Sequence, residues 1–346
     1  MENVIAISHA SDIDGVGSAA LIKMKYGVPA SRIFFTDYAT ESLKSVSASI
    51  GKTLSRNTTL FITDLGVNKK TVPVFYGILK AVKAKGGRIF WFDHHPWADS
   101  AVKRLAPLCD ISILGENEMF CATEITRKEL GFKDGFTKRF CRIVHLSDFA
   151  IRPKSKKDYD LVGFYALSIA LYRMRGHEGN LKGLRHMVDV ICSGKMLDKR
   201  IIGDANRFRK LNDKHVDKML KDVYLGEDIA LGFAGDIQKT YACMKLIERT
   251  GKDIGIYVNV RDRRGHMRSI KNDCTALAVK FGGGGHPHAS GFSPDFKKYN
   301  YFKAHEDKQQ FLADLERELR LIQKNPSSIR KQKSVKESPA RAPLFG

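Results

Sequence analysis

Aspartate and histidine residues gather at four places in the first half of the chain, and three of these directly follow a short apolar run. The residues are His9, Asp12, Asp14, Asp64, Asp93, His94, His95 and Asp148. Five carboxylates in one cleft repel one another unless cations neutralise them. Carboxylate oxygens combined with a few imidazoles suit Mn²⁺ and admit Mg²⁺. Two such ions about 3.5–4 Å apart promote in-line attack on phosphorus, and we predict a site of this kind.

The elements that must position these residues form a strand–helix alternation. Near-continuous apolar runs predict strands at Val4–Ser8, Ile33–Thr36, Thr59–Thr63 and Arg88–Phe92. The helical patterns between them cover Gly17–Tyr26, Glu41–Ile50 and Pro73–Ala84. Such alternation predicts an α/β domain with a parallel sheet covered on both faces. Because the carboxyl ends of parallel strands face one crevice, three of the acidic clusters are expected to converge there.

Each of these residues also has an ordinary explanation when it is taken alone. An aspartate after a strand is commonly a helix N-cap, and Asp14 before Gly15 is a candidate for that role. The adjacent histidines could be surface or packing residues, and Asp148 could be a residue at a helix end. Their common position relative to the strands favours the metal site over these separate explanations.

The second half predicts a helical region followed by a smaller α/β unit. A charged helical connector is expected at Ile201–Leu220. Strands, helices and a closing amphipathic helix are then expected at Ile229–Phe233, Tyr241–Thr250, Ile254–Val260, Thr275–Lys280 and Phe311–Gln323. The predicted organisation is a catalytic domain at 1–200, a connector at 201–222, a substrate-binding domain at 223–323 and a disordered basic tail at 324–346, with the active-site cleft between the two domains.

A glycine run in the basic half offers a site for anions. Gly282–Gly285 precedes His286, and a hairpin-like stretch rich in arginine, Val258–Ser269, lies upstream. Successive glycine N–H groups can form an anion nest, and arginine forks bind phosphate in a bidentate manner. The alternative from the residues alone is a solvated loop followed by a glycine-rich turn.

The charge distribution also indicates a polyanionic partner. The 346-residue chain has a formal net charge of +21, divided as +5 in residues 1–150, +11 in 151–323 and +5 in 324–346. A basic domain attracts nucleic acid, although a soluble basic surface would give the same net charge.

The composition excludes a collagen or a disulfide-stapled miniprotein. The longest apolar run, Leu161–Tyr172, is shorter than the roughly 18 residues of a membrane span. Six scattered cysteines and no visible secretory signal favour free thiols and a cytoplasmic location.

Taken together, these residues resemble the DHH phosphoesterase superfamily. Its type motif corresponds to Asp93-His94-His95 and its D-x-D-G element to Asp12–Gly15, while Asp64 and Asp148 match its two single aspartates. The second half resembles the DHH-associated nucleic-acid-binding domain through Met267–Ser269 and Phe281–Phe292. The resemblance covers residues 1–323 and uses five motifs in order.

The resemblance implies roles for the acidic residues. Asp12 would bind one metal ion, Asp14, His94 and Asp148 would bind the other, and Asp64 would bridge them. Asp93 would support His94 or lie near the metals, and His95 would contact the scissile phosphate and assist proton transfer. His9 is a further candidate ligand, but it lies three residues before Asp12 where several relatives have a histidine four residues before. Its role is therefore left open.

The resemblance also implies a substrate-binding set in the second half. Its members would grip the far phosphate or terminal nucleotide, and they are Arg268, Ser269, Gly283, Gly284, Gly285 and His286. Pro287-His288 replaces the basic pair that often follows the glycine element. The glycine-rich domain argues against the related inorganic pyrophosphatases, which carry a different C-terminal domain.

The predicted function is metal-dependent hydrolysis of short single-stranded RNA or DNA, as in nanoRNases or RecJ-like exonucleases, and also of nucleoside 3′,5′-bisphosphates. One alternative is a phosphodiesterase for dinucleotides, such as cyclic di-AMP or its linear product. Another is a catalytically inactive replication or repair scaffold, which the intact motifs disfavour. The basic tail, ending in Leu344-Phe345-Gly346, is a candidate for binding a protein partner.

Overall fold

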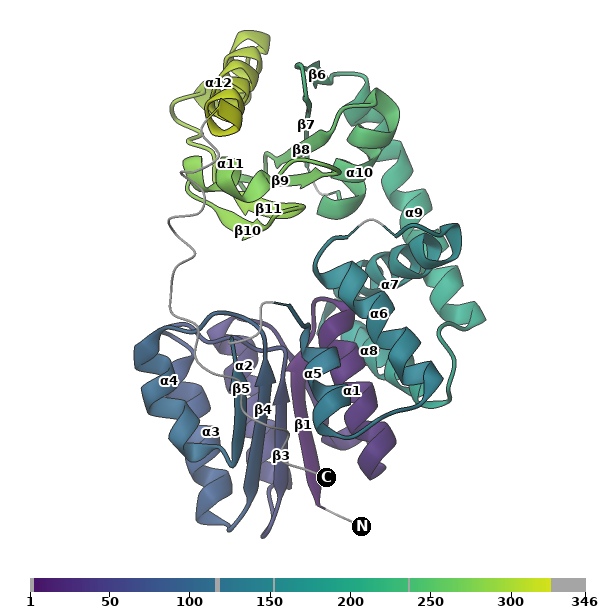
Figure 1. Cartoon of the computed structure of the whole chain (residues 1–346), viewed down its shortest axis with the longest axis vertical. Coiled ribbons are helices and arrows are strands. Elements are labelled where there is room, and N and C mark those ends of the chain that lie inside the picture. Colours follow the sequence, from purple (N-terminus) through teal and green to yellow (C-terminus); the bar gives the residue numbers. More distant parts are fainter. Residues whose placement is uncertain (1–2, 116–118, 152, 236, 325–346) are drawn as a thin grey trace. The chain divides into compact units, whose positions relative to one another are not determined.

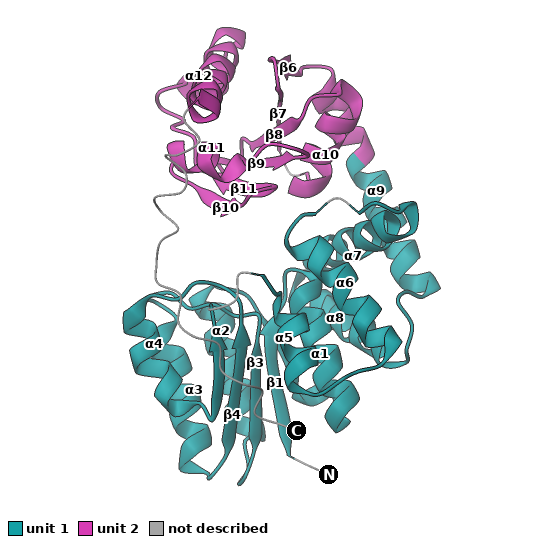
Figure 2. Cartoon of the chain, viewed as in Figure 1, with its two compact units in different colours: residues 1–212 teal, residues 213–346 magenta. Residues whose placement is uncertain are grey.

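The chain folds into two compact units, residues 1–212 and 213–346, in a computed structural model that describes residues 3–115, 119–151, 153–235 and 237–324 (Figure 2). The boundary between the units falls inside helix α9 (Lys199–Leu220), in the region for which the sequence predicted a connector. The predicted tail lies outside the described residues except for Lys324, which ends the last helix. Each of the six cysteines, all in described positions, is a free thiol.

Unit 1 is built on a five-stranded sheet whose paired strands are all parallel (Figure 1). The strand order is β2-β1-β3-β4-β5. The strands are β1 (Val4–His9), β2 (Ile33–Thr36), β3 (Thr59–Thr63), β4 (Arg88–Asp93) and β5 (Ile111–Leu114). The four predicted strands are confirmed, but β5 was missed. It is a short edge strand whose residues are only half-buried, so it lacks the long apolar run of the central strands.

Helices cover both faces of this sheet, because successive residues of its central strands point to opposite sides. Val4 and Ala6 of β1 join the core under one group of helices, while Ile5 and Ile7 join the core on the other side. The helices of unit 1, besides α9, are α1 (Ile13–Tyr26), α2 (Thr40–Thr53), α3 (Val72–Ala84), α4 (Asp99–Leu105), α5 (Ala122–Glu129), α6 (Gly135–Asp148), α7 (Lys156–Met174) and α8 (Gly176–Cys192). Among the helices in the described ranges, none has the length and apolar character needed to cross a membrane.

Unit 2 contains a six-stranded mixed sheet in the order β10-β11-β9-β8-β7-β6. Its elements are β6 (Tyr224–Leu225), β7 (Ile229–Ala234), α10 (Lys239–Thr250), β8 (Ile254–Asn259), β9 (Arg264–Ser269), α11 (Cys274–Lys280), β10 (Gly284–His286), β11 (Ala289–Phe292) and α12 (His305–Lys324). The predicted arginine-rich hairpin is the antiparallel pair β8–β9. An aromatic core that includes Phe292, Phe302 and Phe311 lies beneath α11 and α12. The chain is therefore an α/β protein with a parallel-sheet unit and a smaller mixed unit.

Candidate metal centre and active site

The central strands β1, β3 and β4 are neighbours in the sheet, and their carboxyl ends supply most of the candidate residues. His9 ends β1 and Asp93 ends β4, while Asp64 directly follows β3. Asp148 is the last residue of α6, where the helix dipole disfavours a carboxylate. Asp148 therefore does not stabilise α6, and its position at the edge of the sheet points to another role.

The loop after β1 is held in one conformation by hydrogen bonds of the Asp12 and Ser8 side chains and by a close backbone contact at Gly15. The Asp12 carboxylate caps α1 by accepting hydrogen bonds from the N–H groups of Asp14 (3.1 Å) and Gly15 (3.3 Å). A Cβ atom on Gly15 would lie 2.2 Å from the carbonyl oxygen of His9, so only glycine fits there. The buried Ser8 hydroxyl bonds both the Gly15 carbonyl (2.6 Å) and the Thr63 hydroxyl (2.7 Å). These contacts join the loop to β3.

Asp14 has a structural partner that the sequence did not reveal. Its two carboxylate oxygens accept hydrogen bonds from the N–H groups of Ala122 and Thr123, each 2.7 Å long, at the start of α5. Asp14 therefore accepts hydrogen bonds at the N-terminus of α5, and Asp12 rather than Asp14 is the N-cap of α1. The carboxylate of Asp14 is fully buried and fixed in direction.

Asp64 adopts a left-handed backbone conformation, with φ of 55°. Such a conformation is uncommon for a residue with a side chain and marks a site where surrounding contacts hold it. The N–H of Asp64 donates to the Phe92 carbonyl (3.0 Å), and the Trp91 indole donates to the Leu65 carbonyl (3.1 Å). Strand β4 thus fixes the turn that directs the buried Asp64 carboxylate.

Two groups of candidate ligands result, and Asp64 belongs to one and borders the other. In the first, Nδ1 of His9 lies 3.0 Å from Oδ2 of Asp12 and 3.3 Å from Oδ2 of Asp64. In the second, Nε2 of His94 lies 3.5 Å from Oδ2 of Asp148 and 3.8 Å from Oδ2 of Asp14. In each group the ligand atoms all lie within 4.8 Å of one another.

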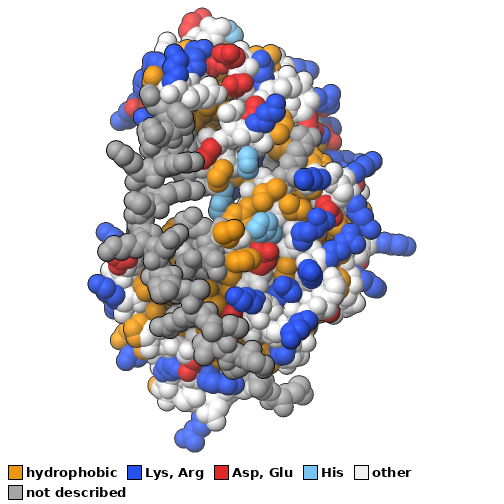
Figure 3. All heavy atoms as spheres, in the orientation of Figure 1, with side chains coloured by type: hydrophobic (Ala, Val, Ile, Leu, Met, Phe, Trp, Pro, Cys, Tyr) orange, Lys and Arg blue, Asp and Glu red, His pale blue; other side chains and the backbone are white. Residues whose placement is uncertain are grey.

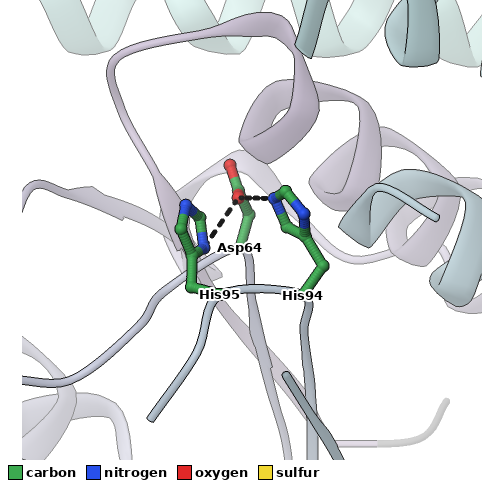
Figure 4. A group of neighbouring side chains, drawn as sticks. All are labelled: Asp64, His94 and His95. Atoms are coloured by element: carbon green, nitrogen blue, oxygen red, sulfur yellow. Dashed lines mark ion pairs between the residues drawn. The ribbon is translucent and has the colours of Figure 1, made fainter. Parts of the chain in front are cut away.

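The second oxygen of Asp64 faces the histidines (Figure 4). Its Oδ1 lies 3.7 Å from Nε2 of His94 and 3.9 Å from Nδ1 of His95. Oδ1 therefore faces the second group while Oδ2 serves the first. This is the arrangement expected of a bridging carboxylate.

The donor atoms in these groups fit divalent cations. Within the part of the chain that the structure describes, four buried polar atoms, one from each of four candidate ligands, make no hydrogen bond of good geometry; they are Nδ1 of His9, Oδ2 of Asp64, Nε2 of His94 and Oδ2 of Asp148. Buried polar atoms are nearly always hydrogen-bonded, so four that converge call for another partner. A set of carboxylate oxygens with two imidazole nitrogens is the donor set of Mn²⁺ or Mg²⁺ sites.

The electrostatics of the two groups lead to the same conclusion. Burial and the charges of Asp12 and Asp14 raise the pKa of Asp64 well above its usual value. Burial, Asp14 and Asp64 raise the pKa of Asp148 to about 10. Burial disfavours a charged His9, yet the contacts with Asp12 and Asp64 outweigh it and raise the pKa of His9. Burial thus disfavours the ionised forms of Asp64 and Asp148 unless a cation is bound beside them.

Asp93 was expected to support His94 or to lie near the metals, and the hydrogen bonds of its carboxylate join it to His95 and Trp97. Its Oδ1 accepts from Nδ1 of His95 (2.7 Å), and its Oδ2 accepts from the Trp97 indole (2.7 Å). Burial disfavours charge on His95, but the hydrogen bond and charge of Asp93 outweigh it, and the pKa of His95 is raised. A Cβ atom on Gly66 would lie 3.1 Å from Cβ of His95. Asp93 therefore orients His95.

Tyr38 belongs to the site but was not predicted. Its hydroxyl oxygen lies 3.4 Å from Nε2 of His95, and its ring centroid lies 4.8 Å from that of His9. Burial and the charge of Asp64 raise the pKa of Tyr38, so its hydroxyl stays protonated. Tyr38 follows β2 at the same edge of the sheet, and the rule that found the acidic clusters would have found it had polar aromatics been included.

The predicted residues of unit 2 are close in the fold, but several are engaged within it. Arg268 donates to the Thr240 hydroxyl (2.9 Å), while its buried Nε has no partner among the described residues. The Ser269 hydroxyl donates to the carbonyl of Asn272. Arg268 also donates to the Met267 carbonyl (3.0 Å), and Ser269 uses its donor to close its own loop.

The last two glycines of the run, Gly284 and Gly285, lie in strand β10, where the sequence left open a nest for anions or a glycine-rich turn. Strand β10 pairs with β11, with Gly284 opposite Gly291 and His286 opposite Ala289. A Cβ atom on Gly283 would lie 2.0 Å from the Gly291 carbonyl oxygen. The close approach that requires glycine at position 283 is therefore to the neighbouring strand, and β10 is one of the two edge strands of this sheet.

Comparison with known proteins places the fold. No protein-family model and no curated protein matches this sequence. The solved structure of the pGpG-specific phosphodiesterase PggH from Vibrio cholerae is similar, with a TM-score of 0.51 at 12% identity over 91% of this chain and 99% of that one. The chain therefore shares the overall fold of that structure.

Two further solved structures are similar. An exopolyphosphatase-related protein from Bacteroides fragilis has a TM-score of 0.47 at 16% identity, covering 91% of this chain and 94% of that one. RecJ from Thermus thermophilus, solved in complex with Mn²⁺, has a TM-score of 0.49 at 13% identity over 90% of this chain. The matched region is 52% of the RecJ chain, so this protein corresponds to about half of it.

Proposed function

We propose that this protein is a metal-dependent phosphodiesterase that hydrolyses short single-stranded oligonucleotides. The observation that carries the proposal is the placement of Asp64. Its Oδ2 lies 3.3 Å from His9 and its Oδ1 lies 3.7 Å from His94, so one carboxylate joins two groups of candidate metal ligands. The similarity of fold to a phosphodiesterase supports the reaction class.

The residues divide into two ligand sets. His9, Asp12 and Asp64 would hold one cation, and the other would be held by Asp14, His94 and Asp148 with Asp64 between them. Divalent ions bound there supply positive charge that stabilises a phosphoryl group under attack. The imidazole content favours Mn²⁺, with Mg²⁺ as the alternative ion. Inclusion of His9 is supported by its buried Nδ1, which lies 3.0 Å from the carboxylate of Asp12 and 3.3 Å from that of Asp64.

His95 is the candidate for proton transfer to the leaving group. Because Nδ1–H donates to Asp93, the tautomer and direction of the ring are fixed, and Nε2 faces outward toward Tyr38. The raised pKa favours the charged imidazole, and in that form Nε2 can donate a proton to an oxygen or hold a phosphate oxygen. Trp97 holds Asp93 in place, and Asp93 acts through His95.

Unit 2 would provide the contacts that select the substrate. Arg268 lies on β9, and β10 (Gly284–His286) is an edge strand of the same sheet. Arginine suits phosphate through its planar fork of donors. The excess of positive charge in residues 151–323, net +11, would attract an oligonucleotide or a nucleoside 3′,5′-bisphosphate.

A dinucleotide phosphodiesterase is the second candidate, because the similar Vibrio cholerae structure is described as pGpG-specific and its full length is covered. The two candidates share the chemistry and differ in substrate length. Mn²⁺-dependent digestion of 5′- and 3′-labelled RNA and DNA, from dinucleotides to long strands, separates them. Preference for strands of several nucleotides supports the first, and exclusive turnover of dinucleotides supports the second.

Two variants test the assignment of the site in the same assay. Asp64→Ala is expected to abolish hydrolysis, because both ligand sets lose a member. Arg268→Ala is expected mainly to raise KM, because Arg268 would bind substrate without joining the reaction. Metal-dependent turnover retained in Asp64→Ala would disprove the site. Calorimetry that detects no Mn²⁺ binding to the wild-type protein would instead support a catalytically inactive scaffold.

A further inference from the structure

One tyrosine of unit 2 is turned outward from an aromatic core. Tyr301, in the short η3 turn (Asn300–Phe302), is 40% exposed, whereas Tyr299 and Phe302 beside it are 3% and 4% exposed. The ring of Phe302 packs against Phe233 and Phe311 inside the unit, with centroid separations of 4.9 and 5.2 Å. The core thus holds both aromatic neighbours of Tyr301 but not Tyr301 itself.

The backbone that presents Tyr301 is strained. Asn300, Tyr301 and Phe302 have φ values of 43°, 59° and 56°, a left-handed run that side chains disfavour and that persists only where other contacts hold it. Burial of Phe302 provides one such contact, and a hydrogen bond from Tyr301 N–H to the Phe296 carbonyl (2.6 Å) provides another. The turn is therefore fixed with its tyrosine exposed.

Cations surround the exposed ring. Arg263, in the turn between β8 and β9, lies with its guanidinium carbon 5.3 Å from the Tyr301 centroid, and the Lys303 ammonium lies 5.9 Å from it. Arg264 is exposed at the start of β9. Within the described ranges, none of these three cations pairs with a carboxylate, and the adjacent Asp262 accepts a hydrogen bond from the Asn259 amide (2.9 Å). Tyr301, Arg263, Arg264 and Lys303 are named here the Tyr301 platform.

Positive charge alone does not distinguish this surface. Lysine and arginine side chains are spread over the face drawn in Figure 3 rather than gathered at one point. What distinguishes the platform is an exposed aromatic ring among cations that lack acidic partners. Bases of single strands stack on tyrosine rings and arginine planes, and their phosphates bind nearby cations.

We propose that the Tyr301 platform binds single-stranded nucleic acid, with a base stacked against Tyr301 and Arg263 and phosphates held by Arg264 and Lys303. The proposal deepens the proposed function and rests on it for the identity of the substrate. Arg264 and Arg268 are four residues apart on β9, roughly 13 Å in an extended strand. The platform therefore engages nucleotides beyond those held at Arg268, and it favours strands longer than a dinucleotide.

The test measures binding of fluorescent single strands of about 5 and 12 nucleotides, lengths within the usual range of single-strand sites, in EDTA so that no hydrolysis occurs. Tyr301→Asn removes the ring and keeps a residue that tolerates the left-handed backbone. It should weaken binding of the longer strand about tenfold, the effect of losing one stacked base. Tyr301→Phe should restore wild-type affinity because the ring, rather than the hydroxyl, stacks.

Two arginine variants complete the design. Arg263→Ala should weaken binding. It should also lower the slope of log Kd against the logarithm of the salt concentration by about one. Arg249→Ala removes the same charge from an exposed position at the far end of α10 and should change affinity less than twofold. Unchanged affinity in Tyr301→Asn, or equal losses in Arg263→Ala and Arg249→Ala, would overturn the proposal. Metal-dependent turnover by wild-type protein reports separately on the proposed function.

Discussion

Replacing Asp148 by Asn should stabilise the metal-free protein and remove most of the stabilisation that Mn²⁺ provides. The Asp148 carboxylate is 14% exposed and lies 3.5 Å from Nε2 of His94. Burial together with Asp14 and Asp64 raises its pKa from 3.8 to about 10. Without a cation, folding must therefore protonate an acid that is ionised in the unfolded chain at neutral pH.

The size of this effect follows from the two pKa values. Each pH unit between them costs 1.36 kcal/mol, so at pH 7 the cost is about 4 kcal/mol as an upper bound. Because the pKa of Asp148 is higher in the folded protein, Asp148 costs no stability below pH 3.8. Its cost then grows with pH up to about pH 10. Asparagine does not titrate, so the variant should gain up to about 4 kcal/mol at pH 7, or about 10 °C in Tm for a unit of this size.

Thermal unfolding in EDTA and in Mn²⁺, repeated from pH 5 to 9, measures these effects. We expect a higher Tm for Asp148→Asn in EDTA, a weaker decrease of Tm with pH, and little further gain on adding Mn²⁺. Asp99→Asn is the matched control, because Asp99 is exposed in the first turn of α4 and should lose only about 0.3–1 kcal/mol. An unchanged metal-free Tm together with full Mn²⁺ stabilisation would refute the reasoning.

Three further predictions concern the same edge of the sheet. Tyr38→Phe should lower kcat roughly two- to tenfold, the effect of one hydrogen bond, with little change in KM; steady-state kinetics that show only a KM effect would contradict a role through His95. Asp93→Asn should lower the pKa of His95, so the decrease of kcat with rising pH should begin at lower pH; an unshifted pH–rate profile would separate His95 from proton transfer. Gly15→Ala should destabilise unit 1 by about 2–3 kcal/mol through overpacking, measured by denaturant unfolding. Gly51→Ala, where a Cβ atom meets open space, is the control and should stabilise by about 0.4–1 kcal/mol.

Much of unit 1 could be predicted because its signals are local. The runs at β1 and β3 are apolar along their whole length, as strands covered on both faces must be. Once those strands are parallel, their carboxyl ends share an edge, and His9, Asp12, Asp64 and Asp93 must follow one another around it. The short edge strand β5 lacked this signal because it is only half-buried.

The partners of these side chains could not be predicted, because they come from distant parts of the chain. Asp14 receives the N–H groups of Ala122 and Thr123, more than 100 residues away. Nothing in the order of residues says that a carboxylate which could cap its own helix instead serves another. The hydrogen bond between Asp93 and His95 was likewise not visible in the sequence.

The order of residues was enough to predict which carboxylates and imidazoles lie at strand ends and which half of the chain carries most of the positive charge. Composition and short-range periodicity suffice for these, since they depend on neighbours along the chain. Three features are visible only in the folded protein: Asp64 faces two ligand groups, β10 pairs with β11, and Tyr301 is exposed. These features depend on side-chain direction and on packing between distant segments, and both are set when the core closes.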